Sequence, residues 1–319
     1  MNIKIGNTPM IKIRYKYNNK EEEFYTKLEF YNLTGSIKDR VAYYILNKAY
    51  EQGMLKKGME VVEATSGNTG ISLSAMGSYL GNPVHIFMPD WVSKERLSLM
   101  KMYNANVTLI SKNEGGFEKA VENAKEYATK NNAFLANQFS NPYNTLAHYE
   151  TTGKEIIETL GDKIGGFVSG IGTGGTLIGT GKRLKEFNSN IKIYALEPDK
   201  MPLLSQNKVI SNHKIEGIGD DFIPEIVERQ IIDKIITVND DDSINMAKKI
   251  AQNLGIGVGI SSGANMIASV LAKENNSKAI VTVFPDDNKK YITTELSEPI
   301  KNNSEFISNK IDIIDYEFI

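Results

Sequence analysis

The stretch "GIGTGGTLIGTGKR", Gly170–Arg183, indicates the fold more clearly than any other part of the sequence. It continues from "GGFVSG", a run typical of a buried strand, and its second half opens "TLIGTGKRLKEFN", a run typical of a helix. Glycines at such a turn let the backbone approach a ligand closely, and the helix N-terminus directs several N–H groups toward an anion. The stretch therefore predicts an anion-binding turn between a strand and a helix.

Strand-like and helix-like runs alternate on both sides of this turn. The strands are expected in "MEVVEAT", "PVHIFMP", "NVTLIS", "IKIYALEP", "IITVN" and "KAIVTVFP", with helices such as "NTGISLSAMGSYLG" and "DSINMAKKIAQNLG" between them. Such alternation favours an α/β fold with parallel sheets covered by helices on both faces. The closing run "IDIIDYEFI" is interpreted as a short docked tail, with an edge strand or a partner-binding tail as the alternatives.

Composition narrows the class of protein. A chain of 319 residues is long enough for more than one domain, and a formal net charge of −2 gives no broad basic field for nucleic acid or anionic membrane. The absence of cysteine excludes disulfides, thiolate metal sites and a cysteine nucleophile. No run has the length and hydrophobicity of a membrane span or a secretory leader. We therefore expect a cytoplasmic protein without a metal site that binds neither nucleic acid nor membrane.

The anion at the glycine turn has two interpretations. Gly170, Gly172 and Gly175 form a G-x-G-x-x-G pattern, and Glu197 follows 22 residues after Gly175, which matches a dinucleotide fingerprint. The hydroxyl groups of Thr173 and Thr176 fit equally well with a single terminal phosphate, because they can donate to its oxygens. The turn thus predicts a phosphate-binding site. Other motifs of the chain are needed to distinguish the pyrophosphate of a dinucleotide from a phosphate monoester.

A lysine and a second turn favour the phosphate monoester. "KLEFYNLTGSIKDR" places Lys38 directly before a predicted helix, and a partly desolvated lysine amine can form a Schiff base with an aldehyde. "EATSGNTG", residues 63–70, is a second strand–turn–helix junction that is rich in hydroxyl groups and contains no cation, which suits a carboxylate. A phosphorylated aldehyde cofactor and an amino-acid carboxylate together would use all three features.

Seven motifs now carry a resemblance to a known family. In chain order they are "NLTGSIKDR", "EATSGNTGI", "NQFSNPYNTLAHYETTGKEI", "GIGTGGT", "EGIGDDFIP", "GISSGAN" and "PDDNKKYITTELS". From about Gly6 to Glu298 the chain resembles the cysteine synthase and cystathionine β-synthase family of fold-type II pyridoxal-phosphate enzymes. The resemblance implies two open parallel-sheet domains of the tryptophan synthase β type. Residues 1–36 and 147–319 would form the larger domain, which binds the cofactor phosphate, and residues 37–146 a smaller mobile one, which carries the lysine and the carboxylate loop.

The resemblance also implies the site residues. Lys38 would hold pyridoxal 5'-phosphate, Asn68 would bind the ring oxygen of the cofactor, and Gln138 would complete the substrate-carboxylate pocket. His148, in the motif "AHYETTGKEI", is interpreted as structural. The loop that matches the substrate-carboxylate site contains Thr65, Ser66, Gly67 and Thr69, with Gly217 on the wall of the active site. The cup that matches the phosphate site contains Gly172, Thr173, Gly174, Gly175 and Thr176.

The chain departs from the family pattern at two places. Relatives commonly have a serine hydroxyl at the pyridine nitrogen, where this chain has Asp286 and Asp287, and a carboxylate there would favour the protonated ring nitrogen. Either aspartate could align, and a solvated turn is the alternative. Asp220 and Asp221 follow "GIG", where cysteine synthases tend to have small residues. A carboxylate there could orient water or a thiol, or repel an anionic nucleophile, with a helix cap as the alternative.

The expected chemistry is β-replacement on an L-serine- or L-cysteine-type amino acid through an α-aminoacrylate, with Lys38 as the base. Cysteine synthesis from O-acetylserine and sulfide is the main prediction. The alternative is a cysteine-consuming reaction that releases hydrogen sulfide and forms serine, lanthionine or cystathionine. A nicotinamide-dependent dehydrogenase would leave Lys38 and Gln138 unexplained, and the retained lysine argues against an inactive regulatory relative. The partners implied are a small amino acid, a thiol or sulfide and a second copy in a homodimer; serine acetyltransferase is a further possible partner.

Overall fold

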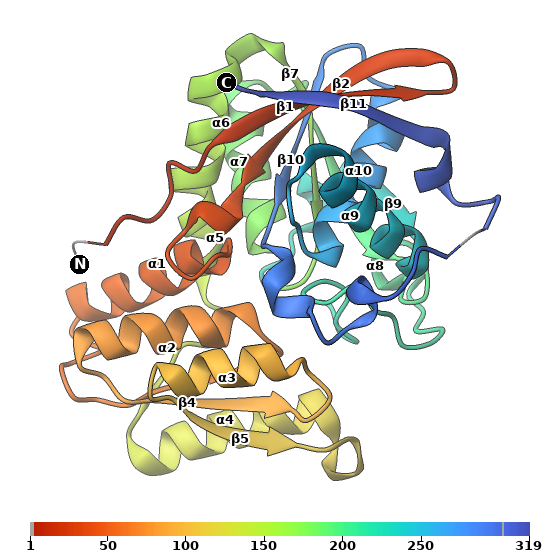
Figure 1. Ribbon diagram of the computed structural model, residues 1–319. Coiled ribbons are helices and arrows are strands. Elements are labelled where there is room, and N and C mark those ends of the chain that lie inside the picture. The colour runs from red at the N-terminus through yellow and green to blue at the C-terminus, as the bar shows by residue number, and fades with distance from the viewer. Residues whose placement is uncertain (1–2, 302) are drawn as a thin grey trace.

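Two β-sheets with helices around them form the structure, a computed structural model that describes residues 3–301 and 303–319. Figure 1 shows the smaller sheet below helices α1 and α2, and the larger sheet above them, with the C-terminus on the larger part. The strand order is β5-β4-β3-β6 in the smaller sheet and β11-β1-β2-β10-β7-β8-β9 in the larger one. The predicted α/β class with two sheets is confirmed.

The smaller sheet is parallel throughout and has helices on both faces. Successive strand residues point to opposite faces, so that Val61 and Ile86 pack with the helices α1 to α3, whereas Val62 and Phe87 pack with α4. The elements are α1 (Lys38–Glu51), β3 (Val61–Ala64), α2 (Asn68–Leu80), β4 (Val84–Pro89), α3 (Lys94–Met102), β5 (Asn106–Ile110), α4 (Gly116–Asn131) and β6 (Phe134–Leu135).

The larger sheet is mixed. Strands β2, β10, β7, β8 and β9 run parallel, and β1 and β11 extend the sheet beyond β2 by antiparallel pairing. Helices α6 and α7 pack on one face of the sheet and α9 and α10 on the other. The elements are β1 (Met10–Tyr17), β2 (Lys20–Leu28), α6 (Gly153–Leu160), β7 (Ile164–Gly170), α7 (Gly175–Phe187), β8 (Lys192–Pro198), α8 (Leu203–Gln206), β9 (Lys234–Val238), α9 (Asp240–Leu254), α10 (Ile260–Lys273), β10 (Ala279–Phe284) and β11 (Ile311–Phe318).

The C-terminal run is an edge strand docked on the sheet. β11 pairs antiparallel with β1, with Ile13 opposite Tyr316, and the Arg14 guanidinium pairs with Asp315 across the two strands. The side chains of Ile311 and Ile313 are buried, whereas Tyr316 and Phe318 remain exposed. The docked tail and the edge strand expected from the sequence are therefore the same element.

A helical segment of three parts connects the two sheets. α5 (Pro142–Ala147) begins with a proline in its first turn after Asn141, whose side chain accepts a hydrogen bond from the Tyr143 N–H. A π-helical turn, His148–Thr152, follows directly, and α6 continues from it. This segment packs on α7, and it thereby brings residues 142–152 behind the glycine turn at 170–175.

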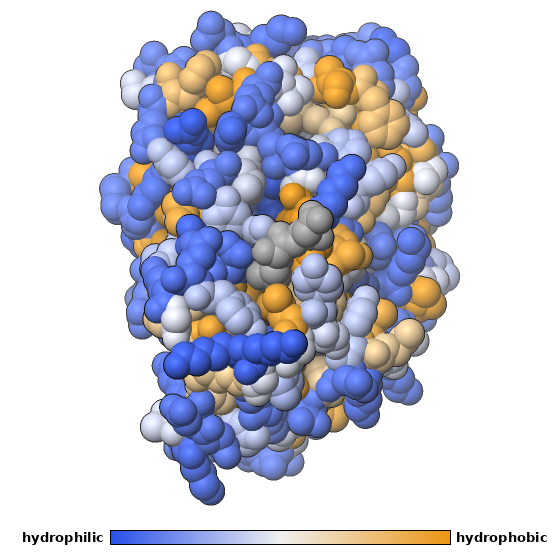
Figure 2. Space-filling model, turned by 90° about the vertical axis from the view of Figure 1, so that its left-hand side faces the viewer, coloured by the Kyte–Doolittle hydropathy of each residue, from blue (hydrophilic) through white to orange (hydrophobic). Residues whose placement is uncertain are grey.

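The outer surface gives little indication of a partner class. Figure 2 shows one face on which hydrophilic residues predominate and hydrophobic residues lie between them in small groups. None of the helices in the described part of the chain is long and apolar enough to cross a membrane. Residues 3–301 and 303–319 also contain no cluster of three or more histidine, aspartate or glutamate side chains that could hold a metal ion.

Candidate active site

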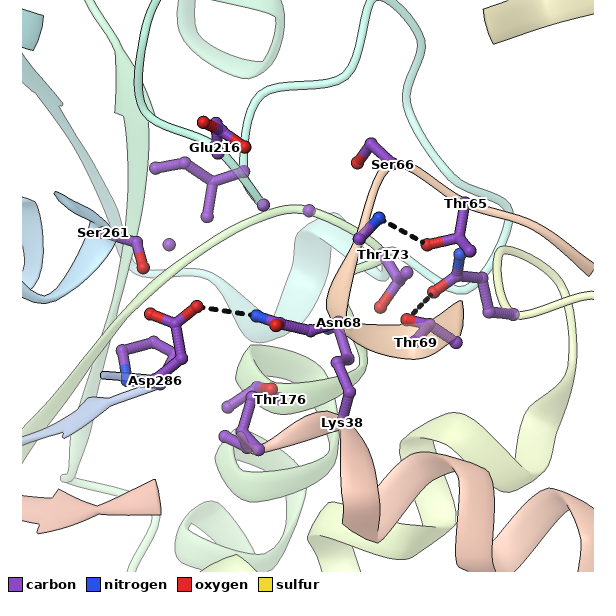
Figure 3. A pocket seen from close by; sticks show the side chains of 18 of the residues that line it. Lys38, Thr65, Ser66, Asn68, Thr69, Thr173, Thr176, Glu216, Ser261 and Asp286 are labelled. Atoms are coloured by element: carbon purple, nitrogen blue, oxygen red, sulfur yellow. Dashed lines mark hydrogen bonds between the residues drawn. The ribbon is translucent and has the colours of Figure 1, made fainter. Parts of the chain in front are cut away.

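A pocket of about 880 Å³, measured with its open mouth, lies between the two sheets and collects most of the predicted residues. Its walls are the turns after β3, β7 and β10, the start of α1 and the segment 216–220. Ligands of open α/β sheets bind at the carboxyl ends of the strands in this way. Figure 3 shows that Lys38, Asn68, Thr176 and Asp286 surround the same space although they come from four different elements.

Lys38 is the first residue of α1, and the backbone before it is tied to the loop after β10. The Ile37 N–H donates to the Pro285 carbonyl oxygen at 2.8 Å, and Ser36 forms a β-bridge with Asp286. Within the described residues, the Lys38 ammonium group has no hydrogen-bond or ion-pair partner. Burial lowers the pKa of Lys38, while the negative charges of Asp220 and Asp286 oppose the shift. A larger fraction of this amine is therefore neutral near pH 7 than in a surface lysine, and only the neutral amine can act as a nucleophile or accept a proton.

The glycine turn forms a cup at the N-terminus of α7. Gly174 has a φ of +90°, which an L side chain rarely adopts, and it caps the helix. A Cβ on Gly172 would lie 2.3 Å from the Gly217 carbonyl oxygen, so only glycine lets these two loops meet. Thr173 and Thr176 line the cup with their hydroxyl groups. The cup offers backbone N–H groups, two hydroxyls and a helix dipole, which are suitable donors for a phosphate.

The second turn lies opposite and brings distant residues together. The Thr65 hydroxyl accepts a hydrogen bond from the Gly67 N–H at 3.1 Å, and the Thr69 hydroxyl donates to the Gln138 side-chain oxygen at 2.7 Å. Ser66, Gly67 and Asn68 also line the pocket. The predicted carboxylate loop and Gln138 therefore form one surface, at the start of α2.

Asn68 and Asp286 meet across the pocket, and each keeps a free oxygen. The Asn68 amide donates to Asp286 Oδ2 at 2.7 Å, and the Tyr291 hydroxyl donates to the same oxygen at 2.7 Å. Asn68 Oδ1 and Asp286 Oδ1 are buried and lack a partner within the described residues. Unpartnered buried oxygens beside a phosphate cup and a lysine fit a ring that carries its own hydrogen-bonding groups, as pyridoxal phosphate does.

The two aspartates of "PDD" occupy different environments. Asp286 is buried in the pocket, whereas the Asp287 carboxylate accepts a hydrogen bond from the Lys289 N–H at 3.1 Å and caps a short helix outside it. The two aspartates of "GIGDDF" are also separated. Asp220 lines the pocket, and Asp221 is exposed in an adjoining hollow. Gly217, with a φ of +86°, lies in the wall between them and the glycine cup.

Asp220 has an unusual acidity for a carboxyl group. Burial and the neighbouring negative charge of Asp221 raise its pKa to about 6, although the positive charge of Lys38 acts in the opposite direction. A carboxylate with such a pKa is largely ionised at neutral pH and can still accept a proton effectively. The pocket thus contains two candidate bases, Lys38 and Asp220.

Glu197 does not act as the acidic residue of a dinucleotide site. Its carboxylate accepts hydrogen bonds from the Leu204 N–H at 2.8 Å and the Ser205 N–H at 3.1 Å, and so caps α8. The position of Glu197 is therefore explained by its role as a helix cap. The dehydrogenase interpretation required Glu197 to bind a ribose, and it now rests on the G-x-G-x-x-G pattern alone.

Sequence reasoning missed several residues of the pocket wall. Ser261 lies in the first turn of α10, where the glycine and hydroxyl groups of "GISSGAN" at a helix start could have identified it. Arg96 pairs with Glu216 and lies 4.6 Å over the centre of the Tyr291 ring, which joins the two parts of the chain at the pocket. No local pattern distinguishes Arg96 from the other cations of α3.

Comparisons with known proteins agree with this geometry. The family model described as pyridoxal-phosphate dependent enzyme matches residues 1–286. A cysteine synthase of Staphylococcus aureus (strain Mu50) is 40% identical over 295 residues, which cover 92% of this chain and 94% of that protein. A hydrogen sulfide-producing enzyme from Fusobacterium nucleatum is 48% identical with a TM-score of 0.94, and the match covers 99% of this chain and 97% of that one.

One further solved structure is similar to this chain. It is an aspartate-to-asparagine variant of a hydrogen sulfide-producing enzyme in complex with an α-aminoacrylate intermediate. It is 49% identical to this chain with a TM-score of 0.94, and the match covers 97% of this chain and 95% of that one. The family model and the relatives point to the same family, and the glycine cup beside Lys38 is consistent with it. The chain belongs to the family of pyridoxal-phosphate dependent enzymes.

Proposed function

We propose that this chain catalyses β-replacement on L-cysteine, releasing hydrogen sulfide, with Asp220 as the group that receives the proton of the incoming nucleophile. The observation that carries the proposal is the Asp220 carboxylate, which lines the same pocket as Lys38 and has a pKa raised to about 6. A base in this position suits a nucleophile that arrives with a proton, such as water or a thiol.

Different residues of the pocket would bind different parts of the cofactor. Lys38 would carry pyridoxal phosphate covalently, the 172–176 cup would bind its phosphate, and Asn68 and Asp286 would contact its ring. When bound, the cofactor supplies an electron sink that allows bonds at the α- and β-carbons of the amino acid to break. Asp286 supports this sink, because a carboxylate at the ring nitrogen favours the protonated form.

The remaining groups act on the amino acid. Thr65, Ser66, Thr69 and Gln138 would bind the substrate carboxylate through hydroxyl, amide and backbone N–H groups at the start of α2. Lys38 would remove the α-proton and later return a proton to the same carbon. In the overall reaction with water, the Cβ–S bond of cysteine breaks and the sulfur leaves as hydrosulfide, which takes up a proton from solvent to form hydrogen sulfide. The water oxygen then bonds to Cβ, and its proton passes to Asp220 and on to solvent.

The charge of the pocket mouth favours the cysteine-consuming reaction over cysteine synthesis by addition of sulfide. Glu216, Asp220, Asp221 and Glu295 line the hollow that leads into the site. Glu216 is paired with Arg96, and Glu295 with Lys214 at 3.2 Å, whereas Asp220 and Asp221 have no such ion pair within the described residues. The hollow also contains Lys112 and Lys38 lies near Asp220, but the two carboxylates without an ion pair disfavour hydrosulfide and do not repel neutral water.

Cysteine synthesis from O-acetylserine and sulfide is the second candidate. The name of the Staphylococcus aureus relative favours it, and the same lysine, carboxylate loop and phosphate cup would serve it. The two candidates differ in the leaving group and in the nucleophile, so a product assay separates them.

The assay compares two reaction mixtures with the purified enzyme, cysteine in water and O-acetylserine with sulfide. We expect sulfide and serine to accumulate from cysteine, and Lys38→Ala to abolish both. Faster formation of cysteine from O-acetylserine and sulfide would instead establish the second candidate. Absence of turnover in both mixtures would contradict β-replacement. Adding a second thiol amino acid to the cysteine mixture tests whether lanthionine or cystathionine forms in place of serine.

Two features of organisation are further proposals. We propose that residues 37–146 move as a unit against residues 1–36 and 147–319, since the pocket lies between the two sheets. We also propose a homodimer, which an outer groove lined by Phe30, Tyr31, Tyr316 and Phe318 supports, because the last three of these side chains are exposed. Light scattering measures the mass in solution, and a monomer would contradict the second proposal.

A further inference from the structure

Two buried polar side chains lie directly behind the phosphate cup. Asn144 on α5 and His148 on the π-turn are four residues apart, so they project from the same side of this helical segment. Both are 0% exposed, and neither lines the pocket. Each contacts one of the two threonine hydroxyls of the cup, Thr173 and Thr176.

The Asn144 amide can face Thr173 in only one orientation. Its Nδ2 donates to the Gln138 carbonyl oxygen at 2.8 Å and to the Thr173 hydroxyl oxygen at 2.9 Å. A carbonyl oxygen only accepts, so Gln138 fixes the amide with its nitrogen on this side. The Thr173 oxygen also accepts from the Gly175 N–H at 3.4 Å. With its oxygen occupied as an acceptor, the Thr173 hydroxyl has its proton left to donate into the cup.

His148 connects Thr176 to a third hydroxyl. Its Nε2 lies 3.2 Å from the Thr176 oxygen and its Nδ1 lies 3.0 Å from the Thr152 oxygen. Burial, together with the positive charges of Arg40 and Lys38, holds the pKa of His148 well below its ordinary value, so the ring is neutral. A neutral ring has one donor and one acceptor. If Nε2 carries the hydrogen, Thr152 donates to Nδ1 and Thr176 is left to donate to the cup.

Glycines on α7 allow these contacts. A Cβ on Gly175 would lie 1.9 Å from Asn144 Oδ1, and a Cβ on Gly179 would lie 2.2 Å from the Thr145 carbonyl oxygen and 2.9 Å from His148 Cβ. The π-turn that contains His148 is itself an uncommon geometry that often marks functional sites. The close contact and the irregular turn place both donors within hydrogen-bond distance of the cup.

We infer that Asn144 and His148 are positioning residues that hold the Thr173 and Thr176 hydroxyls as donors toward the cofactor phosphate. The inference rests on the proposed function, because the cup must bind that phosphate. A phosphate dianion only accepts hydrogen bonds, so a hydroxyl that already accepts from behind is oriented to donate to it. Asn144 Nδ2 donates such a hydrogen bond to the Thr173 oxygen, and the hydrogen on His148 Nε2 donates one to the Thr176 oxygen.

The first experiment measures the affinity of the enzyme for pyridoxal phosphate and the ³¹P signal of the bound phosphate. The cofactor is removed and then titrated back into the wild type, Asn144→Ala, His148→Leu and His148→Gln. We expect roughly tenfold weaker binding and a shifted ³¹P resonance for Asn144→Ala and His148→Leu, as for the loss of one hydrogen bond to a charged group. His148→Gln keeps a donor and should recover most of the affinity. Tyr149→Phe, which removes a hydroxyl that donates to Glu186 on the outer surface, is the matched control.

The second experiment observes the wild-type ring itself, and a variant serves only to assign its signals. Proton–nitrogen NMR of the wild-type holoenzyme identifies the hydrogen-bearing nitrogen of His148, because the chain has three histidines and His148→Gln removes the signals of one. Hydrogen on Nε2 supports the inference, and hydrogen on Nδ1 overturns it for Thr176. Unchanged affinity and ³¹P shift in Asn144→Ala and His148→Leu overturn it as a whole. Failure of the wild type to bind pyridoxal phosphate contradicts the proposed function, and the inference falls with it.

Discussion

Asn68 donates a hydrogen bond to Asp286 at 2.7 Å, although the two residues lie 218 positions apart and follow strands of different sheets. Asn68 begins α2 beside the smaller sheet, and Asp286 follows β10 of the larger one. Both residues line a pocket that neither sheet forms alone, and each keeps a buried oxygen without a partner within the described residues. A ligand that contacts both residues would link the two parts of the chain, and binding between the two side chains would require their direct hydrogen bond to open.

Replacing Asp286 by asparagine tests its role at the ring nitrogen. The variant keeps the shape and removes the negative charge, so the protonated form of the ring is less favoured and the visible absorbance of the bound cofactor should shift. Turnover should fall, because the electron sink is weaker. Asp287→Asn, outside the pocket, is the control. An identical spectrum in wild type and Asp286→Asn would show that Asp286 does not contact the ring.

Replacing Lys38 by alanine should abolish covalent attachment of pyridoxal phosphate and reduce turnover by about 10²–10⁴-fold from the lost base alone. Borohydride reduction of the wild type followed by peptide mass spectrometry identifies the modified lysine. Lys289→Ala changes an exposed lysine near the site and should have no effect. Modification of a lysine other than Lys38 would contradict the assignment.

Asp220→Asn should stall the second half of the reaction, because the variant retains Lys38 and loses the base that receives the proton of the nucleophile. Stopped-flow spectra with cysteine should show fast formation of an intermediate followed by slow decay. Asp221→Asn keeps the Asp220 carboxylate and should decay much faster than Asp220→Asn, although the loss of the Asp221 charge lowers the pKa of Asp220. Normal turnover of Asp220→Asn with water and thiols would favour the cysteine synthase candidate.

A substitution of Gly174 tests whether the 172–176 cup binds the cofactor phosphate. Gly174→Ala places a Cβ 2.6 Å from Val227 in a backbone conformation with a φ of +90°, and it should weaken retention of pyridoxal phosphate. Gly58→Ala has a similar φ of +79° with open space around it, so it controls for backbone strain alone. Pyridoxal phosphate should raise the melting temperature of wild type and of Gly58→Ala but much less that of Gly174→Ala. Stabilisation by a nicotinamide dinucleotide instead would favour a dehydrogenase.

Glu63 makes the stability of the protein depend on pH. Burial raises its pKa to about 8, although hydrogen bonds from the Gln138 and Ala64 N–H groups oppose this. The unfolded chain loses this proton near the ordinary value of 4.5, so the folded state binds more protons between pH 4.5 and 8. This contribution to the free energy of unfolding therefore decreases as pH rises across that window, by on the order of a few kcal/mol.

Thermal melts of wild type and Glu63→Gln from pH 5 to pH 9 measure this effect. Glutamine does not titrate, and it faces two N–H donors with only one acceptor oxygen, so the variant should be less stable at pH 5. The difference should shrink toward pH 8 and stay constant above it. Parallel curves for the two proteins over the whole range would exclude Glu63 as the titrating group.

The sequence by itself determined the features that depend on neighbouring residues. A strand, a glycine turn and a helix start specify an anion cup locally, because the backbone N–H groups and the helix dipole are all supplied within a few residues. Both cups were therefore predictable at 65–69 and 172–176. The alternation of strand-like and helix-like runs indicated the α/β class, and the motif resemblance gave Lys38, Asn68 and Gln138 their expected roles in a family that the family match supports.

Only the tertiary structure decided which of two adjacent aspartates enters the pocket. Neighbouring side chains point in different directions, and Asp286 is directed inward because Ser36 pairs with its backbone and Tyr291 binds its carboxylate. The tertiary structure likewise decided that Asp220 and not Asp221 lines the pocket, and that Glu197 caps a helix. It also brought His148 into contact with Thr176, 28 residues further along the chain. These outcomes depend on which distant surfaces pack together, and residue spacing within one segment carries no information about that.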